Sequence, residues 1–138
     1  LTGELFSLLS ERSVLKHSLS KEGLDEEIFK NSIQEIISDN KIFAARLFSL
    51  RAESILENLS DLNARSRLSG YLIGLELSGS RSYWLGETVF ILGEDSISLA
   101  YEIGLRSQGA AVSRELLDKE ASLEGLKAIF NYKNHMDL

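Results

Sequence analysis

Leu68-Ser69-Gly70-Tyr71-Leu72-Ile73-Gly74-Leu75-Glu76-Leu77 is the stretch that decides how this chain folds, because it places two glycines and one carboxylate inside an apolar helix. Each glycine inside a helix costs roughly 0.5–1 kcal/mol relative to alanine. A carboxylate between leucines needs a cation or several hydrogen-bond donors if it is buried. We therefore expect this helix to pack closely against another segment or to line a ligand site.

Small residues in this stretch recur at intervals of four. Gly70, Gly74 and Ser78 share one face of the predicted helix, which lets another backbone approach closely. Packing between helices and a position beside a ligand both explain this row, and the spacing does not separate them. For Glu76 the alternatives are a solvent-exposed position or a partnered one, with Arg51 as the candidate cation.

Length and composition predict a single domain over residues 1–138, with 43% hydrophobic and 26% charged residues. The net charge of -6 argues against a general binder of nucleic acid or of anionic membranes. The chain has no cysteine, which excludes disulfides and fits the cytoplasm. No apolar run approaches the roughly 18–20 residues of a membrane span. The absence of proline favours helices.

Apolar residues at helical spacing dominate the first part of the chain. They predict helices over about residues 3–9, 25–38 and 64–78, with a further helix between the last two. A turn near residues 58–61 is expected to end that further helix. Its buried face is expected to carry Phe48, Ala52, Ile55, Leu59 and Leu62.

The pattern changes in the last third of the chain. Residues 89–92 are apolar throughout and end at Gly93, which predicts a strand buried on both faces of a parallel sheet. A helix over about 95–107 and a second strand over 110–113 follow. A last helix over about 118–130 is expected to cover one sheet face. The predicted fold class is α/β, mainly helical, with a small mixed or parallel sheet.

Other candidate sites are weak. The aromatic side chains of Tyr83, Trp84 and Phe90 are expected in the core or at a sheet edge, because no basic patch accompanies them. His17 and His135 lie far apart without acidic companions, so no dedicated metal site is expected. No Gly-x-Ser-x-Gly motif supports a serine hydrolase.

Three blocks of this chain resemble the 2-dehydro-3-deoxygalactonokinases, sugar-acid kinases of the actin-like ATPase superfamily. The blocks are Leu1-Thr2-Gly3-Glu4-Leu5-Phe6, Leu47-Phe48-Ser49-Leu50-Arg51 and the residues 68–77 quoted above, in the family's order. The resemblance extends from residue 1 to about 130 and covers the C-terminal half of such an enzyme. It implies the C-terminal lobe of a ribonuclease H-like sugar kinase, without its N-terminal lobe. The missing initiator methionine is consistent with a fragment.

The resemblance also implies a site in the cleft between the two lobes. The implied substrate-binding residues are Arg51, Ser69, Gly70 and Glu76. The implied nucleotide-binding residues are Thr2, Gly3 and Gly93. The catalytic base is expected in the missing half, as is the Gly-Thr-His-Ser-Lys run that precedes Thr2 in the family. The residues alone leave a structural alternative in each case, since Thr2 also suits a helix cap and Gly93 a plain turn between strand and helix.

The implied activity is transfer of the γ-phosphate of ATP, with Mg²⁺, to the 6-hydroxyl of 2-dehydro-3-deoxygalactonate in galactonate catabolism. This chain alone is expected to be inactive, because phosphoryl transfer depends on positioning by both lobes. The implied partners are the sugar acid, the nucleotide and the N-terminal lobe, with a homodimer left open. The alternatives are a kinase for another sugar or sugar acid, and a noncatalytic helical module that docks a partner helix on the small-residue face.

Overall fold

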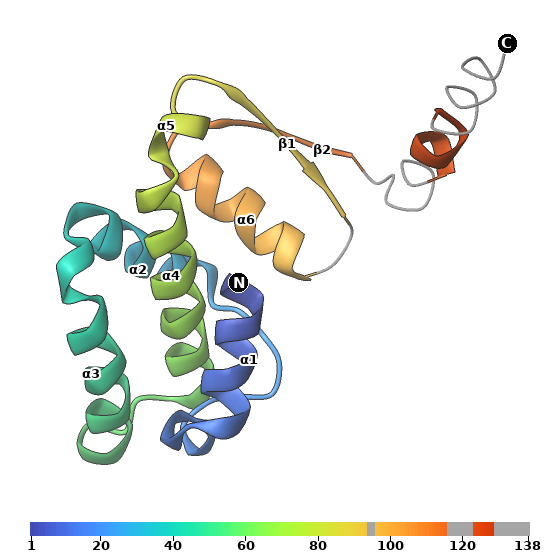
Figure 1. Cartoon of the computed structure of the whole chain (residues 1–138). Helices are drawn as coiled ribbons and strands as arrows, with labels where there is room; N and C mark the ends of the chain where they lie inside the picture. The colour runs from blue at the N-terminus through green and yellow to red at the C-terminus, as the bar shows by residue number, and fades with distance from the viewer. Residues whose placement is uncertain (94–95, 116–122, 129–138) are drawn as a thin grey trace, which may run out of the picture.

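The computed structural model of the chain describes residues 1–93, 96–115 and 123–128. Its longer helices are α1 (Thr2–Arg12), α2 (Glu26–Ser38), α3 (Phe43–Leu56), α4 (Asp61–Gly79) and α6 (Ser96–Ser107). The short elements are the 3₁₀ helices Val14–His17 and Asn40–Ile42, the helix α5 (Arg81–Trp84), and the strands β1 (Thr88–Leu92) and β2 (Ala111–Glu115). In Figure 1, α4 runs through the helical part, and α6 lies along the two strands.

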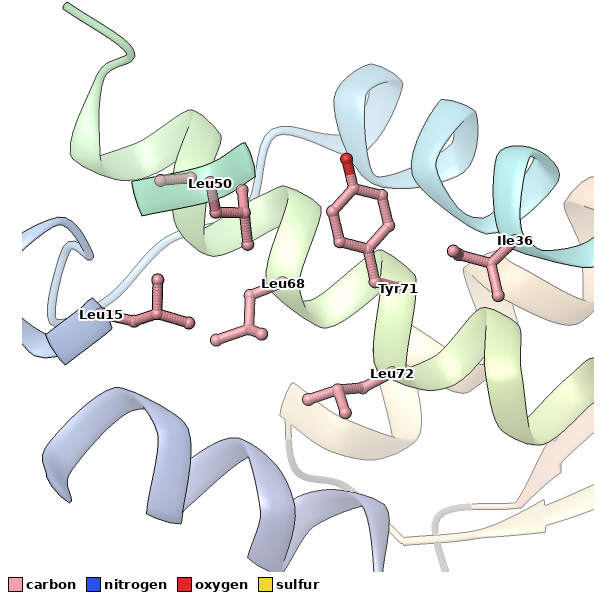
Figure 2. Close-up of a cluster of buried hydrophobic side chains, with 7 residues drawn as sticks. Leu15, Ile36, Leu50, Leu68, Tyr71 and Leu72 are labelled. Carbon is pink, nitrogen blue, oxygen red and sulfur yellow. The ribbon is translucent and has the colours of Figure 1, made fainter. Parts of the chain in front are cut away.

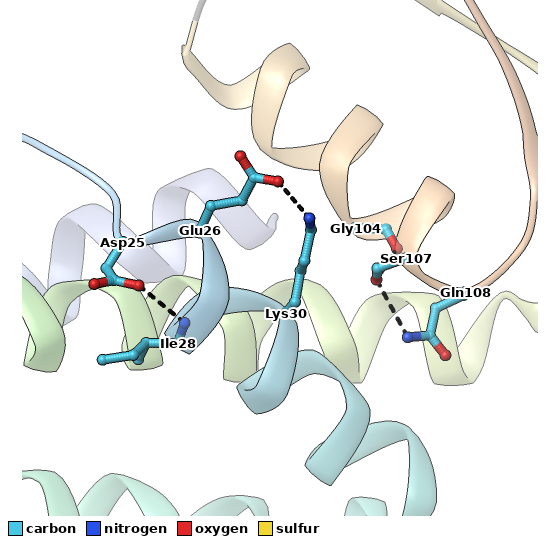
Figure 3. A network of polar contacts seen from close by, with 7 residues as sticks. All are labelled: Asp25, Glu26, Ile28, Lys30, Gly104, Ser107 and Gln108. Carbon is cyan, nitrogen blue, oxygen red and sulfur yellow. Dashed lines mark hydrogen bonds and ion pairs between the residues drawn. The ribbon is translucent and has the colours of Figure 1, made fainter.

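Helix α2 begins where its sequence provides a cap. The Asp25 carboxylate accepts a hydrogen bond of 3.1 Å from the backbone N–H of Ile28, as Figure 3 shows. Glu26 and Glu27 follow in the first turn, where the helix dipole favours negative charge, and Glu26 pairs with Lys30. The predicted helix over 25–38 is therefore confirmed, and its acidic start serves the helix.

Helix α4 is the central element of the fold. It begins after Ser60, whose hydroxyl accepts a hydrogen bond of 3.2 Å from the backbone N–H of Asn63. Residues 70–74 are all buried, so this part of the helix is surrounded by other elements, and α4 contacts α1, α2, α3 and α6. Its buried residues are Ala64, Ser66, Leu68, Gly70, Tyr71, Leu72, Ile73, Gly74 and Leu77.

The glycines of α4 allow its close approach to α2. A Cβ atom added at Gly70 would lie 2.6 Å from the Cβ of Ser32 and 2.7 Å from the carbonyl oxygen of Phe29. At Gly74 it would lie 3.1 Å from the Cα and from the carbonyl oxygen of Ile33. Packing between helices thus accounts for both glycines.

Among the described residues, two clusters of buried side chains form the core, and α4 contributes to both. The first cluster, shown in Figure 2, consists of Leu15, Ile36, Leu50, Ala64, Leu68, Tyr71 and Leu72. The second consists of Phe29, Ile33, Ile73, Leu77, Trp84, Ala100 and Leu105. The first joins the helices α2, α3 and α4, and the second joins α2 and α4 to α5 and α6. α4 therefore fixes α6 relative to the other helices.

Helix α3 packs through a different face from the predicted one. Phe48 and Ile55 are 76% and 59% exposed, whereas Leu50 is 1% exposed and lies in the first cluster. The predicted buried face is therefore wrong for Phe48 and Ile55, because α3 packs against the first cluster through the side that carries Leu50. Leu59, which was also predicted to be buried, does pack against that cluster. The turn near 58–61 is confirmed, since α3 ends at Leu56 and α4 begins at Asp61.

The sheet is small and parallel, as predicted. β1 pairs with β2 in a register that runs from Thr88 opposite Ala111 to Leu92 opposite Glu115. Burial on both faces was wrong for β1, because Phe90 and Leu92 are 63% and 60% exposed. The half-buried side chains on the opposite face of β1 lie toward α6, and no described helix covers the exposed face.

The aromatic side chains near β1 have different surroundings. Trp84 is buried, and its indole N–H donates a hydrogen bond of 2.9 Å to the carbonyl oxygen of Leu77. Tyr83 is 83% exposed on α5, so it is not in the core, one of the two places predicted for it. Of the last predicted helix, residues 123–128 are described; they are helical and exposed, and the rest lies outside the described residues.

Ser66→Ala is expected to lower the free energy of unfolding by about 1–3 kcal/mol, because it leaves a backbone donor without its partner. The buried Ser66 hydroxyl accepts a hydrogen bond of 2.8 Å from the backbone N–H of Asp25 and donates one to the carbonyl oxygen of Leu62. Ser54→Ala is the matched control, since that hydroxyl donates only to Leu50 on its own helix. Urea denaturation measures both, and equal losses would contradict the expectation.

Candidate functional site

A cleft of about 610 Å³ lies where α1, α4 and the start of α6 meet the segment that follows α1. Side chains with hydroxyl groups line it from several elements: Thr2, Ser7, Ser10, Ser20, Ser69, Ser96 and Tyr101. Its apolar lining includes Phe6, Leu19, Leu24, Leu72, Ile73 and Ile97. Its charged lining consists of Lys16, Lys21, Arg65 and Glu11. A cavity of this size with apolar walls and a few polar groups is typical of a small-molecule site.

Arg65 organises the basic end of this cleft. Its guanidinium carbon lies 4.8 Å from the ring centroid of Phe6, and the guanidinium donates a hydrogen bond of 3.2 Å to the carbonyl oxygen of Ser20. Burial lowers the pKa of Arg65, and the nearby carboxylate of Glu22 opposes that shift. Arginine stays charged nonetheless. Arg65 thus ties α4 both to α1 and to the segment that carries Lys21, and keeps a positive charge in the cleft wall.

Three helices meet through Glu76 at the other end. One carboxylate oxygen of Glu76 on α4 accepts hydrogen bonds from the hydroxyl of Thr2 on α1 and, at 2.5 Å, from the hydroxyl of Tyr101 on α6. Burial, together with the hydrogen bond to Glu76, raises the pKa of Tyr101 to about 12. Tyr101 is therefore a neutral donor near pH 7.

The structure brings together some of the residues implied by the resemblance. Thr2, Gly3 and Ser69 all line the cleft, although they lie far apart in sequence. Gly93 directly follows β1 and has a φ of 140°, which favours glycine, and a Cβ atom there would lie 2.5 Å from the hydroxyl of Ser98. Gly93 is not among the lining residues.

The other implied residues lie elsewhere. Arg51 donates a hydrogen bond of 2.9 Å to the hydroxyl of Ser18, so its predicted pairing with Glu76 is wrong. The pairing fails because the donors that reach Glu76 come from α1 and α6 and not from α3. Gly70 faces α2 and does not line the cleft. Glu76 is exposed and does not line the cleft, but it accepts hydrogen bonds from Thr2 and Tyr101, which do line it.

Sequence reasoning missed Lys16, Lys21, Arg65 and Tyr101. The lysines lie between the predicted helices over residues 3–9 and 25–38, and no motif spacing connects them with Arg65 or Tyr101. The only signal was the concentration of positive charge between residues 16 and 21 in an otherwise acidic chain. These positive charges form part of a site only because α4, which carries Arg65, packs beside this segment.

A second hollow, of about 460 Å³, lies between α2 and α6. Its lining includes Lys30 and Arg106, which pair with Glu26 and Glu102 respectively. Figure 3 shows the two helix ends that border it, with Ser107 and Gln108 on the side of α6. Since both cations are paired, this hollow is a weaker candidate than the cleft.

Residues 1–93, 96–115 and 123–128 contain no group of three or more histidines, aspartates and glutamates able to hold a metal ion. The described residues therefore do not fit an Mg²⁺ ion held by protein side chains alone. No helix in the described part of the chain has the length and apolar character needed to cross a membrane.

Comparison with known proteins gives consistent results. A family profile described as 2-keto-3-deoxy-galactonokinase matches residues 1–129. A curated protein of Rhizobium meliloti (strain 1021), "Probable 2-dehydro-3-deoxygalactonokinase DgoK1", is 30% identical over 132 residues, which are 93% of this chain and 43% of that protein.

A crystal structure from Sinorhizobium meliloti, assigned as a 2-dehydro-3-deoxygalactonokinase, is also similar. Its TM-score is 0.74 at 28% sequence identity, and the match covers 83% of this chain and 39% of that one. The chain thus spans less than half the length of both relatives. The match of the family profile over nearly all of its residues shows that the chain belongs to the 2-keto-3-deoxy-galactonokinase family.

Proposed function

We propose that the full-length protein is a cytoplasmic, ATP-dependent kinase that phosphorylates 2-dehydro-3-deoxygalactonate at its 6-hydroxyl, and that this chain forms one wall of its active site. The observation that carries the proposal is the convergence of two family-like blocks on one cleft. Thr2 and Gly3 come from the first block and Ser69 from the third, and all three line it. Membership of the family supplies the reaction class.

The nucleotide is the ligand that the cleft suits best. Apolar side chains such as Phe6 and Ile73 offer contact area for a purine ring, and the hydroxyls of Thr2 and Ser69 offer hydrogen bonds for a ribose. This assignment of Ser69 to the nucleotide replaces the contact with the sugar acid that the resemblance implies. The positive charges of Lys21 and Arg65 favour an anionic ligand. Mg²⁺ neutralises phosphate charge when it is bound to ATP, and the described residues add no cluster of ligands for it.

The sheet supports the proposal that this chain is one lobe of a larger, actin-like enzyme. Parallel sheets are normally covered on both faces, yet Phe90 and Leu92 are more than half exposed. In the described part of the chain the sheet has two strands, so backbone groups along its edges are left unpaired there. We propose that the N-terminal lobe, or the strands that precede this lobe, complete the sheet. The chain's coverage of 43% of its relative leaves room for both.

The noncatalytic module is the weaker alternative. It relied on a free face of small residues that would receive a partner helix. That face is already occupied, because Gly70 and Gly74 lie against α2. A kinase for another sugar acid remains the closer alternative, since specificity contacts from the rest of the protein are outside this chain.

Phosphorylation of 2-dehydro-3-deoxygalactonate by the full-length protein is expected in the presence of Mg-ATP, with the phosphate on the 6-oxygen. A coupled assay for ADP gives the rate, and ³¹P and ¹³C NMR give the position of the phosphate. The chain of residues 1–138 alone is expected to be inactive, because one lobe cannot position both substrates. If the enzyme phosphorylates only a different sugar acid, the proposed substrate is wrong but the kinase activity stands. If it phosphorylates no sugar acid, the proposed kinase activity is wrong.

A further inference from the structure

Glu76 occupies an unusual position next to the cleft. Its carboxylate does not line the cavity, but a single oxygen of it accepts both the Thr2 and the Tyr101 hydroxyl, and both of those residues do line it. Hydrogen bonds to a charged acceptor are about twice as strong as neutral ones. The carboxylate also lies at the first turn of α1, where the helix dipole favours negative charge.

Within the described part of the chain, helix α1 has few other contacts that fix its N-terminal end. It contains no buried residue, and the residue that precedes it, Leu1, gives no side-chain cap. Its apolar contacts with the core come from the partly buried Phe6 and Leu9, further along the helix. Near its start, a Cβ atom on Gly3 would lie 3.5 Å from Cδ1 of Ile97 on α6, which shows how close the two cleft walls come.

We infer that Glu76 is a positioning residue, which joins the N-terminal end of α1 to α6 and thereby sets the width of the cleft, without touching the nucleotide itself. The inference rests on the proposed function in so far as the ligand is ATP. It differs from the role of substrate contact that the resemblance implies for Glu76. The carboxylate is rigid in this role because two donors from different helices converge on the same oxygen.

The test compares Glu76→Ala and Glu76→Gln in the full-length protein with Glu57→Ala as the control. Glu57 is an exposed carboxylate that follows α3 and is not part of the cleft. Steady-state kinetics give KM for ATP and kcat separately. Hydrogen exchange of the backbone amides of α1, with those of α2 as internal reference, reports how firmly α1 is held.

Glu76→Ala is expected to raise KM for ATP about tenfold while kcat changes by less than about threefold, because binding geometry and not the chemical step is disturbed. Exchange at the start of α1 is expected to become about tenfold faster, with α2 unchanged. Glu76→Gln is expected to restore most of both properties, since its amide oxygen accepts the same two hydroxyls. Glu57→Ala is expected to match the wild type.

Three results would overturn the inference. Unchanged exchange in α1 of Glu76→Ala would show that Glu76 does not hold this helix. A large loss of kcat in both Glu76 variants would show that the carboxylate acts on the reacting groups directly. A Glu76→Gln variant as impaired as Glu76→Ala in both measurements would show that hydrogen bonding to the hydroxyls is not what matters. A wild-type protein without kinase activity would refute the proposed function alone, because the exchange measurement still decides the role of Glu76.

Discussion

Gly70→Ala lowers the free energy of unfolding by about 2–3 kcal/mol, although alanine is the better helix former by roughly 1 kcal/mol. The added methyl group has no room, because it would lie 2.6 Å from the Cβ of Ser32 and 2.7 Å from the carbonyl oxygen of Phe29. One of these neighbours is backbone of α2, so α2 and α4 must separate and loosen the core between them.

Gly79→Ala on the same helix is the matched control for Gly70→Ala. No atom lies within 4 Å of a Cβ atom built at Gly79, and its φ is not positive. This substitution is expected to leave stability unchanged or raise it by up to about 1 kcal/mol. Urea denaturation followed by far-UV circular dichroism measures both variants. Equal stability of the two variants would contradict the close approach of α2 and α4.

Ser69→Phe is expected to raise KM for ATP at least about a hundredfold in the full-length protein while the fold is retained. Ser69 is half-buried on α4 and lines the cleft, so an aromatic ring there fills space that the nucleotide would occupy. A ligand that loses several apolar contacts and hydrogen bonds loses roughly 3 kcal/mol, which corresponds to about a hundredfold in affinity.

The control for Ser69→Phe is Ser82→Phe, which adds the same ring at an exposed position on α5 outside the cleft. It is expected to leave KM and kcat within about twofold of the wild type, because substitutions at exposed positions away from a binding site or the core have small effects. Thermal denaturation of both variants separates a blocked cleft from a damaged fold. A fully active Ser69→Phe enzyme would place the nucleotide elsewhere.

Local sequence patterns predicted most elements of the fold. The helix that begins at Glu26, the turn before Asp61 and the run that forms β1 all lie where short-range rules place them. The faces of these elements were harder to predict. Phe48 and Phe90 are apolar and at the right spacing, yet both are exposed, because burial depends on whether another element arrives at that face.

The candidate site was predicted only in part, for the same reason. The resemblance identified Thr2, Gly3 and Ser69, which line the cleft. It did not identify Arg65 or Tyr101, whose places in the cleft depend on contacts with α1, with α6 and with the segment after α1. No spacing along the chain encodes these contacts.

The sequence by itself determined that the chain is mainly helical with a small sheet, and that residues 68–77 form a helix with a special packing requirement. Helix periodicity, caps and glycines act over a few residues, so they can be read along the chain. Only the tertiary structure decided which partner each of these residues packs against or bonds to. The space beside Gly70 is filled by α2, whereas Glu76 accepts hydrogen bonds from hydroxyl groups on α1 and α6. Such partners come from distant parts of the chain, and only the packing of helices brings them within a few ångströms.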